Sequence, residues 1–156
     1  MILVSACLLG VNCRYNGKAK PNRAVIEFLQ DQDFLSFCPE GAGHLPTPRL
    51  PCEIVGGAGP EVISGKAKVQ NEPGDDYSQF FLMGAEAALE FVKTNAIDTA
   101  ILKENSPSCG VSHIYDGTFS HRKIKGMGVT AAKLAENEVK LYTEKTFTKI
   151  KTKKEK

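Results

Sequence analysis

Short, mostly apolar runs along the chain predict buried β-strands. Residues 2–6 (ILVSA), 34–37 (FLSF) and 99–102 (TAIL) are each bounded by polar or glycine-containing segments. Runs of this length are typical of strands that are covered on both faces of a sheet. Val139 and Leu141 alternate with polar residues and predict a final strand.

Apolar residues at helical spacing predict three helices between these strands. Asn22 is a suitable cap for a short helix over Arg23 to Gln30. The clearest helix runs from Tyr77 to Thr94 and begins after Asp76, with an apolar residue recurring every three or four positions. A last helix is predicted from Thr130 to Asn137.

Glycine and proline are dense between residues 40 and 59, so we expect little regular structure there. Residues 62–69 indicate a strand or hairpin, and the segment Tyr115-Asp116-Gly117 lies in a predicted polar loop. Strands that alternate with helices indicate an α/β fold, here a small doubly wound, Rossmann-like and mostly parallel sheet flanked by helices. Ligands of such sheets bind beyond the carboxyl ends of the strands.

Length and charge indicate a single domain. The chain has 156 residues, 42% of them hydrophobic, and a formal net charge of +2. Six lysines lie in residues 145–156, so we expect a domain over residues 1–144 followed by a basic tail. The apolar start has no basic segment before it, and its uncharged run ends at Arg14, too early to span a bilayer. We therefore expect a cytoplasmic protein without a membrane span.

Five cysteines cannot all pair in intramolecular disulfides. Because we expect a cytoplasmic protein, the odd number indicates reduced thiols. Cys7, Cys38 and Cys109 each follow a predicted strand. Since parallel strands end at the same edge of a sheet, we expect these three thiols to meet there and to perform metal or nucleophilic chemistry. For each cysteine taken alone, the alternative is a buried apolar residue. The spacing fits neither a paired C-x-x-C zinc ribbon nor a compact ferredoxin motif.

Other polar residues lie close to these cysteines in the sequence. Glu40 lies two residues after Cys38 and is a candidate general acid or base, with a solvated loop glutamate as the alternative. Ser106, near Cys109, is a candidate for orienting a substrate or water, although serines beside proline are commonly turn residues. Three arginines in polar loops near the predicted crevice are further candidates: Arg14, Arg49 and Arg122.

Four ordered segments resemble the thiouracil desulfurase family across nearly the whole chain: SACLLGVNCRYNGK, CPEGAGHLPTPRLPCEI, ILKENSPSCG and IYDGTF…GMGVTAAKL. Proteins of this family hold a 4Fe-4S cluster through three cysteines and remove sulfur from 2-thiouracil without net redox change. The resemblance therefore implies an iron–sulfur-dependent desulfurase that converts a small thiolated pyrimidine to uracil and sulfide. A thiolated tRNA is the alternative substrate.

Matched motif by motif, the resemblance implies that Cys7, Cys38 and Cys109 are the cluster ligands. It also implies that Glu40 and Ser106 are the catalytic carboxylate and hydroxyl. Cys13 is a rival for one ligand position. The chain departs from the family pattern at three positions, with Asn in place of Asp, His in place of Gly and Cys in place of Ala: Asn16, His44 and Cys52.

Two other functions stay open from the sequence. The first is an iron–sulfur or sulfur carrier without catalysis, which a cluster with cysteine on all four irons would favour. The second is a zinc-bearing RNA-binding module, which the cysteines and the basic residues 145–156 allow. Zinc without iron in the purified protein would favour this second function.

Overall fold

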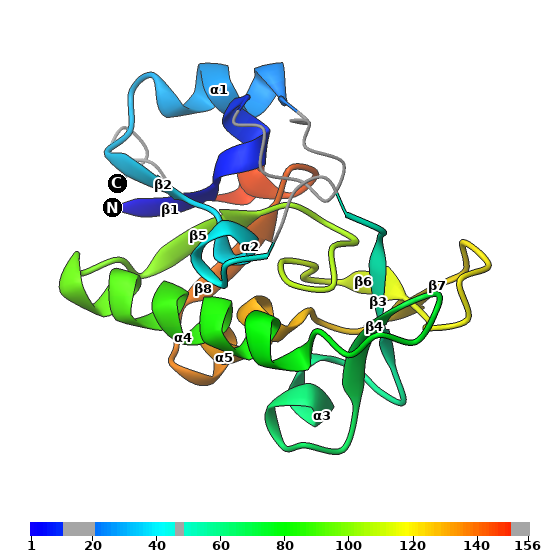
Figure 1. Cartoon of the computed structure of the whole chain (residues 1–156). Helices are drawn as coiled ribbons and strands as arrows, with labels where there is room; N and C mark the ends of the chain where they lie inside the picture. Colours follow the sequence, from blue (N-terminus) through cyan, green and yellow to red (C-terminus); the bar gives the residue numbers. More distant parts are fainter. Residues whose placement is uncertain (11–20, 46–48, 151–156) are drawn as a thin grey trace.

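A sheet of four parallel strands forms the centre of the computed structural model, which describes residues 1–10, 21–45 and 49–150 (Figure 1). The spatial order of the strands is β2-β1-β5-β8, and each neighbouring pair is parallel. The strands are β1 (Ile2–Ser5), β2 (Phe34–Phe37), β5 (Thr99–Leu102) and β8 (Lys140–Thr143). All four lie where the apolar runs predicted strands, so the expected α/β class is confirmed.

Side chains of the central strands alternate between two apolar clusters, one on each face of the sheet. Leu3 and Leu102 pack with residues of α4 (Ser78–Thr94) and α5 (Val129–Glu136). Val4 and Ile101 pack on the opposite face with residues of α1 (Arg23–Leu29). This double coverage explains why β1 is apolar throughout and does not alternate with polar residues.

Two of the three predicted helices begin at a side chain that accepts a backbone N–H. Asn22 Oδ1 accepts the N–H of Val25 at 3.0 Å, and Asp76 Oδ1 accepts the N–H of Ser78 at 2.9 Å. The α1 crossover leads from β1 outward to β2, whereas α4 returns the chain to the other side of β1 (Figure 1). The strand order therefore reverses between β1 and β5, which creates a crevice at their carboxyl ends.

Segments expected to be irregular contain further elements. Residues 39–71 form α2 (Pro39–Ala42), β3 (Cys52–Val55), α3 (Gly59–Ile63) and β4 (Lys68–Asn71), with β3 and β4 paired antiparallel. The expectation of little regular structure over residues 40–59 was wrong for α2 and β3. The strand or hairpin expected over residues 62–69 is found only toward the end of that range, where β4 pairs with β3, because α3 occupies residues 62 and 63. Pro60 in the first turn and the Glu61 carboxylate, which accepts the N–H of Ala58 at 2.9 Å, start a helix instead.

A second hairpin replaces the polar loop expected around Tyr115. It consists of β6 (His113–Tyr115) and β7 (Lys123–Lys125), which pair antiparallel. Packing also continues past residue 144, where we expected a tail: the 3-10 helix η2 (Phe147–Lys149) places the Phe147 ring 5.3 Å from the Phe28 ring, between centroids. Among the described residues, no helix is long and apolar enough to cross a membrane.

Candidate active site

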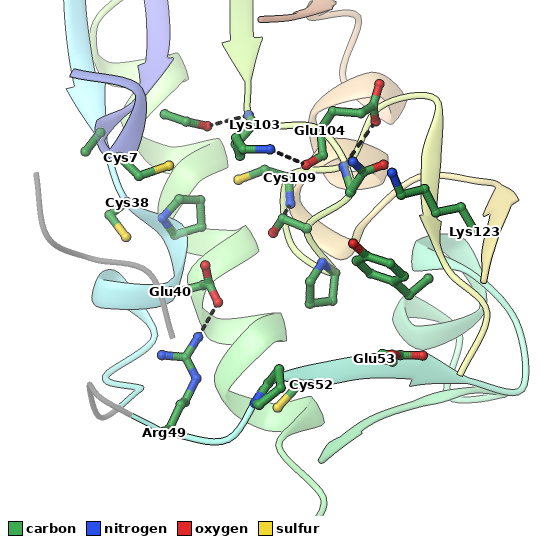
Figure 2. A pocket seen from close by; sticks show the side chains of 18 of the residues that line it. Cys7, Cys38, Glu40, Arg49, Cys52, Glu53, Lys103, Glu104, Cys109 and Lys123 are labelled. Atoms are coloured by element: carbon green, nitrogen blue, oxygen red, sulfur yellow. Dashed lines mark hydrogen bonds and ion pairs between the residues drawn. The ribbon is translucent and has the colours of Figure 1, made fainter. Parts of the chain in front are cut away.

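A cavity of about 360 Å³ opens where the central strands end. Its walls include residues that directly follow β1, β2 and β5, together with residues of the β3–β4 and β6–β7 hairpins (Figure 2). The cavity therefore lies at the switch point of the sheet, where ligands of doubly wound proteins bind.

Three thiols from three strand ends face this cavity (Figure 2). Cys7 lies in the 3-10 helix η1 (Ala6–Leu9) after β1, Cys38 directly follows β2, and Cys109 lies in the loop after β5. The predicted convergence is thus present in the structure, whereas the role of these thiols as ligands stays a prediction. The rival Cys13 lies outside the described residues.

Cys109 lies in an environment that disfavours its thiolate in the absence of a cation. Burial raises the pKa of Cys109, the charge of Glu40 raises it further, and Cys7 and Cys38 act in the same direction, while a hydrogen bond with Ser5 opposes the shift. A bound metal reverses this preference because it displaces the thiol proton.

The donor set fits an iron–sulfur cluster, which proteins hold through cysteine thiolates. Within the described ranges, no three His, Cys, Asp or Glu side chains are arranged to hold a single metal ion. The thiols instead follow three separate strands and line one shared cavity, an arrangement that a multi-iron group can bridge.

The loop that carries Cys109 is fixed from two sides. Within the loop, Ser106 Oγ accepts the N–H groups of Ser108 and Cys109, both at 3.1 Å. From outside, the first turn of α5 donates to the loop carbonyls, with Thr130 N–H to Ser108 O at 2.9 Å. A Cβ atom at Gly128 would lie 2.5 Å from the carbonyl of Ser108, so only glycine permits this approach.

Cys38 and Glu40 are positioned by the close packing of α2 on α4. Cys38 caps α2, and its Sγ accepts the N–H of Gly41 at 3.4 Å. Gly43, directly after α2, and Gly84 on α4 lie against the opposing backbone, because a Cβ atom at either position would lie 2.2 Å from a carbonyl oxygen of the other helix. Gly43 accounts for part of the glycine density that obscured the local structure in the sequence.

Glu40, the predicted catalytic carboxylate, lines the cavity and forms an ion pair with Arg49 (Figure 2). The Arg49 side chain is 5% exposed and that of Glu40 is 17% exposed. Cys52 lies beside this pair, and burial raises the pKa of its thiol to about 11, with the Arg49 charge acting against the shift and the Glu40 charge adding to it. Cys52, one of the three positions where the chain departs from the family pattern, is therefore part of the cavity wall.

The other candidates from the sequence divide into two groups. Ser106 and Arg49 line the cavity, whereas Arg122 is not among its lining residues and Arg14 lies outside the described residues. His44, which departs from the family pattern, is also not among the lining residues. Sequence reasoning missed several polar lining residues: Glu53, Lys103, Glu104, Tyr115 and Lys123. Of these, Glu104 could have been recognised from the sequence, because it lies between a predicted strand and the motif that contains Cys109.

Three comparisons with known proteins agree on the relationship. The model of the 2-thiouracil desulfurase family matches residues 2–146. An uncharacterized protein, YbbK, from Bacillus subtilis (strain 168) is 42% identical over 150 residues, which cover 96% of this chain and 99% of that protein. A solved structure described as the 4Fe-4S-dependent thiouracil desulfidase TudS matches with a TM-score of 0.81 and 38% identity, over 94% of this chain and 92% of that chain. The chain therefore belongs to the 2-thiouracil desulfurase family.

Proposed function

We propose that this protein is a 4Fe-4S-dependent desulfurase that removes sulfur from a thiolated pyrimidine. The observation that carries the proposal is the meeting of Cys7, Cys38 and Cys109 on one cavity that also contains Glu40 and Ser106. The family membership and the 4Fe-4S-dependent relative support it. Three thiolates on a four-iron cluster leave one iron without a protein ligand.

A cluster held by Cys7, Cys38 and Cys109 would supply Lewis acidity toward the sulfur of the substrate, which would make the C–S carbon more electrophilic. The overall reaction needs no electrons. Water provides the oxygen of the new carbonyl group, and the sulfur leaves as hydrogen sulfide, which balances the two protons of the water because uracil carries as many protons as 2-thiouracil. The proposed reaction is therefore a hydrolysis.

Glu40 is proposed to exchange protons with the attacking water or with the pyrimidine. Its place on the cavity wall supports this role, and the adjacent Arg49 fixes its carboxylate through the ion pair. Ser106 is proposed to hold the ring. Its oxygen already accepts two backbone N–H groups, so its hydroxyl proton is available to donate into the cavity.

A cavity of about 360 Å³ is of the size that small-molecule sites have. We therefore propose a small thiopyrimidine as the substrate. A thiolated tRNA would have to present a base that has been turned out of its stack.

The proposal is tested by anaerobic purification, measurement of iron and sulfide, and assay of 2-thiouracil with detection of uracil and sulfide. We expect about four irons per chain and turnover, in line with a four-iron cluster. Glu40→Gln is expected to keep the cluster and lose turnover by about 100-fold or more, the size of a general acid–base contribution. Full turnover in this variant would remove Glu40 from the mechanism. Zinc in place of iron, or a cluster without turnover, would contradict the function.

A further inference from the structure

A single buried carboxylate oxygen organises the loop after β5. Glu104 is 6% exposed, and its Oε1 accepts backbone N–H groups from Val111 at 2.8 Å, Ser112 at 3.0 Å and His113 at 3.1 Å. The N–H of Asn105 lies 3.4 Å from the same oxygen. Three consecutive N–H groups that converge on one point form an anion-binding nest, and here the anion is part of the chain itself.

These hydrogen bonds join the two ends of the loop. The acceptor, Glu104, lies at the start of the segment 104–113, and the three consecutive donors lie at its end. Cys109 lies between them and faces the cavity. The carboxylate thus closes a loop of ten residues around the predicted cluster ligand.

The backbone around Glu104 is held at the ends of three strands, β1, β5 and β8. Its N–H donates to Glu144 Oε1 at 2.8 Å, just after β8, and Glu144 Oε2 pairs with Lys103 Nζ at 2.9 Å. Lys103 N–H donates to Ser5 Oγ at 3.0 Å, at the end of β1 (Figure 2). The position of the nest relative to the cavity is therefore set by the sheet.

We propose that Glu104 is a positioning residue that holds the Cys109 sulfur in place for the cluster. Removal of the carboxylate takes away the one acceptor that joins the N–H groups of residues 111–113 to the start of the loop. Water can accept from these part-buried N–H groups, but it cannot hold the two ends of the loop together. Because the loop ends move, Cys109 between them moves as well. The inference rests on the proposed function, since it takes Cys109 to be a cluster ligand.

The test compares Glu104→Ala with Glu104→Gln. The alanine variant removes every acceptor, whereas the glutamine variant keeps an oxygen that can accept the same N–H groups without the charge. The control is Asp76→Ala, which removes another carboxylate that accepts a backbone N–H, at the start of α4 and outside the Cys109 loop. All variants are compared at a temperature well below their unfolding transitions.

The first measurement uses the cluster-free protein and follows alkylation of Cys109 by mass spectrometry. Cys109 is 5% exposed, so it is expected to react slowly in the wild type and in Asp76→Ala. We expect at least a tenfold faster reaction in Glu104→Ala and a rate closer to wild type in Glu104→Gln. An unchanged rate in Glu104→Ala would overturn the inference.

The second measurement loads the cluster and follows iron content, the electron paramagnetic resonance spectrum of the reduced cluster, and the rate of iron loss to a chelator. Glu104→Ala is expected to lose iron several-fold faster than Asp76→Ala, with partial rescue by Glu104→Gln. Equal retention in the alanine variant would overturn the inference while leaving the proposed function intact. If the wild type itself takes up no cluster, the proposed function fails instead.

Should Glu104→Ala not fold, Glu104→Asp replaces it in both measurements, since its shorter carboxylate cannot reach the same donors.

Discussion

Arg49 and Glu40 form an ion pair in which the arginine is the more deeply buried partner, 5% exposed against 17%. Both side chains line the cavity, and the carboxylate is the more exposed of the two. The ion pair therefore holds Glu40 in place while its carboxylate stays open to the space where a substrate would lie.

The first prediction concerns Arg49→Ala. The variant leaves Glu40 without this partner in a low-polarity environment, and we expect the free energy of unfolding to fall by about 2 kcal/mol or more. Arg49→Lys keeps the charge but not the planar guanidinium, so it is expected to recover stability better than activity. Chemical denaturation and thiouracil turnover measure the two effects. Unchanged stability in Arg49→Ala would show that the pair contributes little.

The second prediction separates the cavity cysteines by function. Cys109→Ala is expected to lose most of its bound iron, whereas Cys52→Ala, which also removes a thiol from the cavity wall, is expected to keep it. Iron and sulfide content after anaerobic reconstitution measures both. Cys13→Ala belongs to the same series, and loss of iron in that variant would give Cys13 a ligand position in place of one of the three predicted.

The third prediction tests the contact between α5 and the Cys109 loop. Gly128 has an ordinary φ of −71°, so the cost of Gly128→Ala is steric: the new methyl group would lie 2.5 Å from the carbonyl of Ser108. We expect a loss of about 2 kcal/mol in unfolding free energy, as for overpacked cores, together with a loss of iron. Gly41→Ala is the control beside another cysteine, because its methyl group would lie 3.7 Å from the Cys38 side chain, an ordinary contact. Thermal unfolding of both variants distinguishes the two sites.

The fourth prediction concerns acid stability. Burial raises the pKa of Glu104, but the backbone N–H groups of His113, Ser112, Val111 and Asn105 outweigh burial, so the pKa lies below its usual value of 4.5. A carboxyl whose pKa is lowered by folding stabilises the protein above its unfolded-state pKa, and that contribution is lost as the pH falls through the folded-state value. We expect Glu104→Gln to be about 2 kcal/mol less stable than wild type near pH 7. The difference should shrink below pH 4, and urea unfolding at several pH values measures it. A difference that is independent of pH would contradict an ionised Glu104.

The parts of the fold that could be predicted are the strands and helices whose buried residues form a continuous apolar run or recur at helical spacing. The strand Ile2–Ser5 is apolar throughout because it is covered on both faces, and the helix Ser78–Thr94 shows its buried stripe in the sequence. The hairpin of β6 and β7 was missed, and the pair of β3 and β4 was anticipated only as a strand or hairpin over residues 62–69, because both pairs depend on contacts between distant segments. Gly117, for example, donates to the Glu53 carboxylate at 2.9 Å, although the two residues are far apart in sequence. Phe147 was missed because the lysines around it indicate a solvated tail.

The candidate site divides in the same way. Cys7, Cys38 and Cys109 could be predicted because strand ends are visible in the sequence and parallel strands end at one edge. The network around Lys103 and Glu104 could not, because it depends on Glu144, a residue of the last strand's end. The sequence does not show that a charged residue beside a strand is part of a network when its partner lies in a distant segment.

The parallel pairing of β1 with both β2 and β5 also sets an order of events during biosynthesis. The third thiol arrives only after two-thirds of the chain has been made, and η2, near the end of the described chain, completes the apolar cluster beneath β1. A nascent chain cannot present all three sulfurs early, in contrast to short metal-binding motifs whose ligands are neighbours. With Cys7, Cys38 and Cys109 as the proposed ligands, cofactor insertion is therefore expected only after the sheet that gathers these thiols has been made.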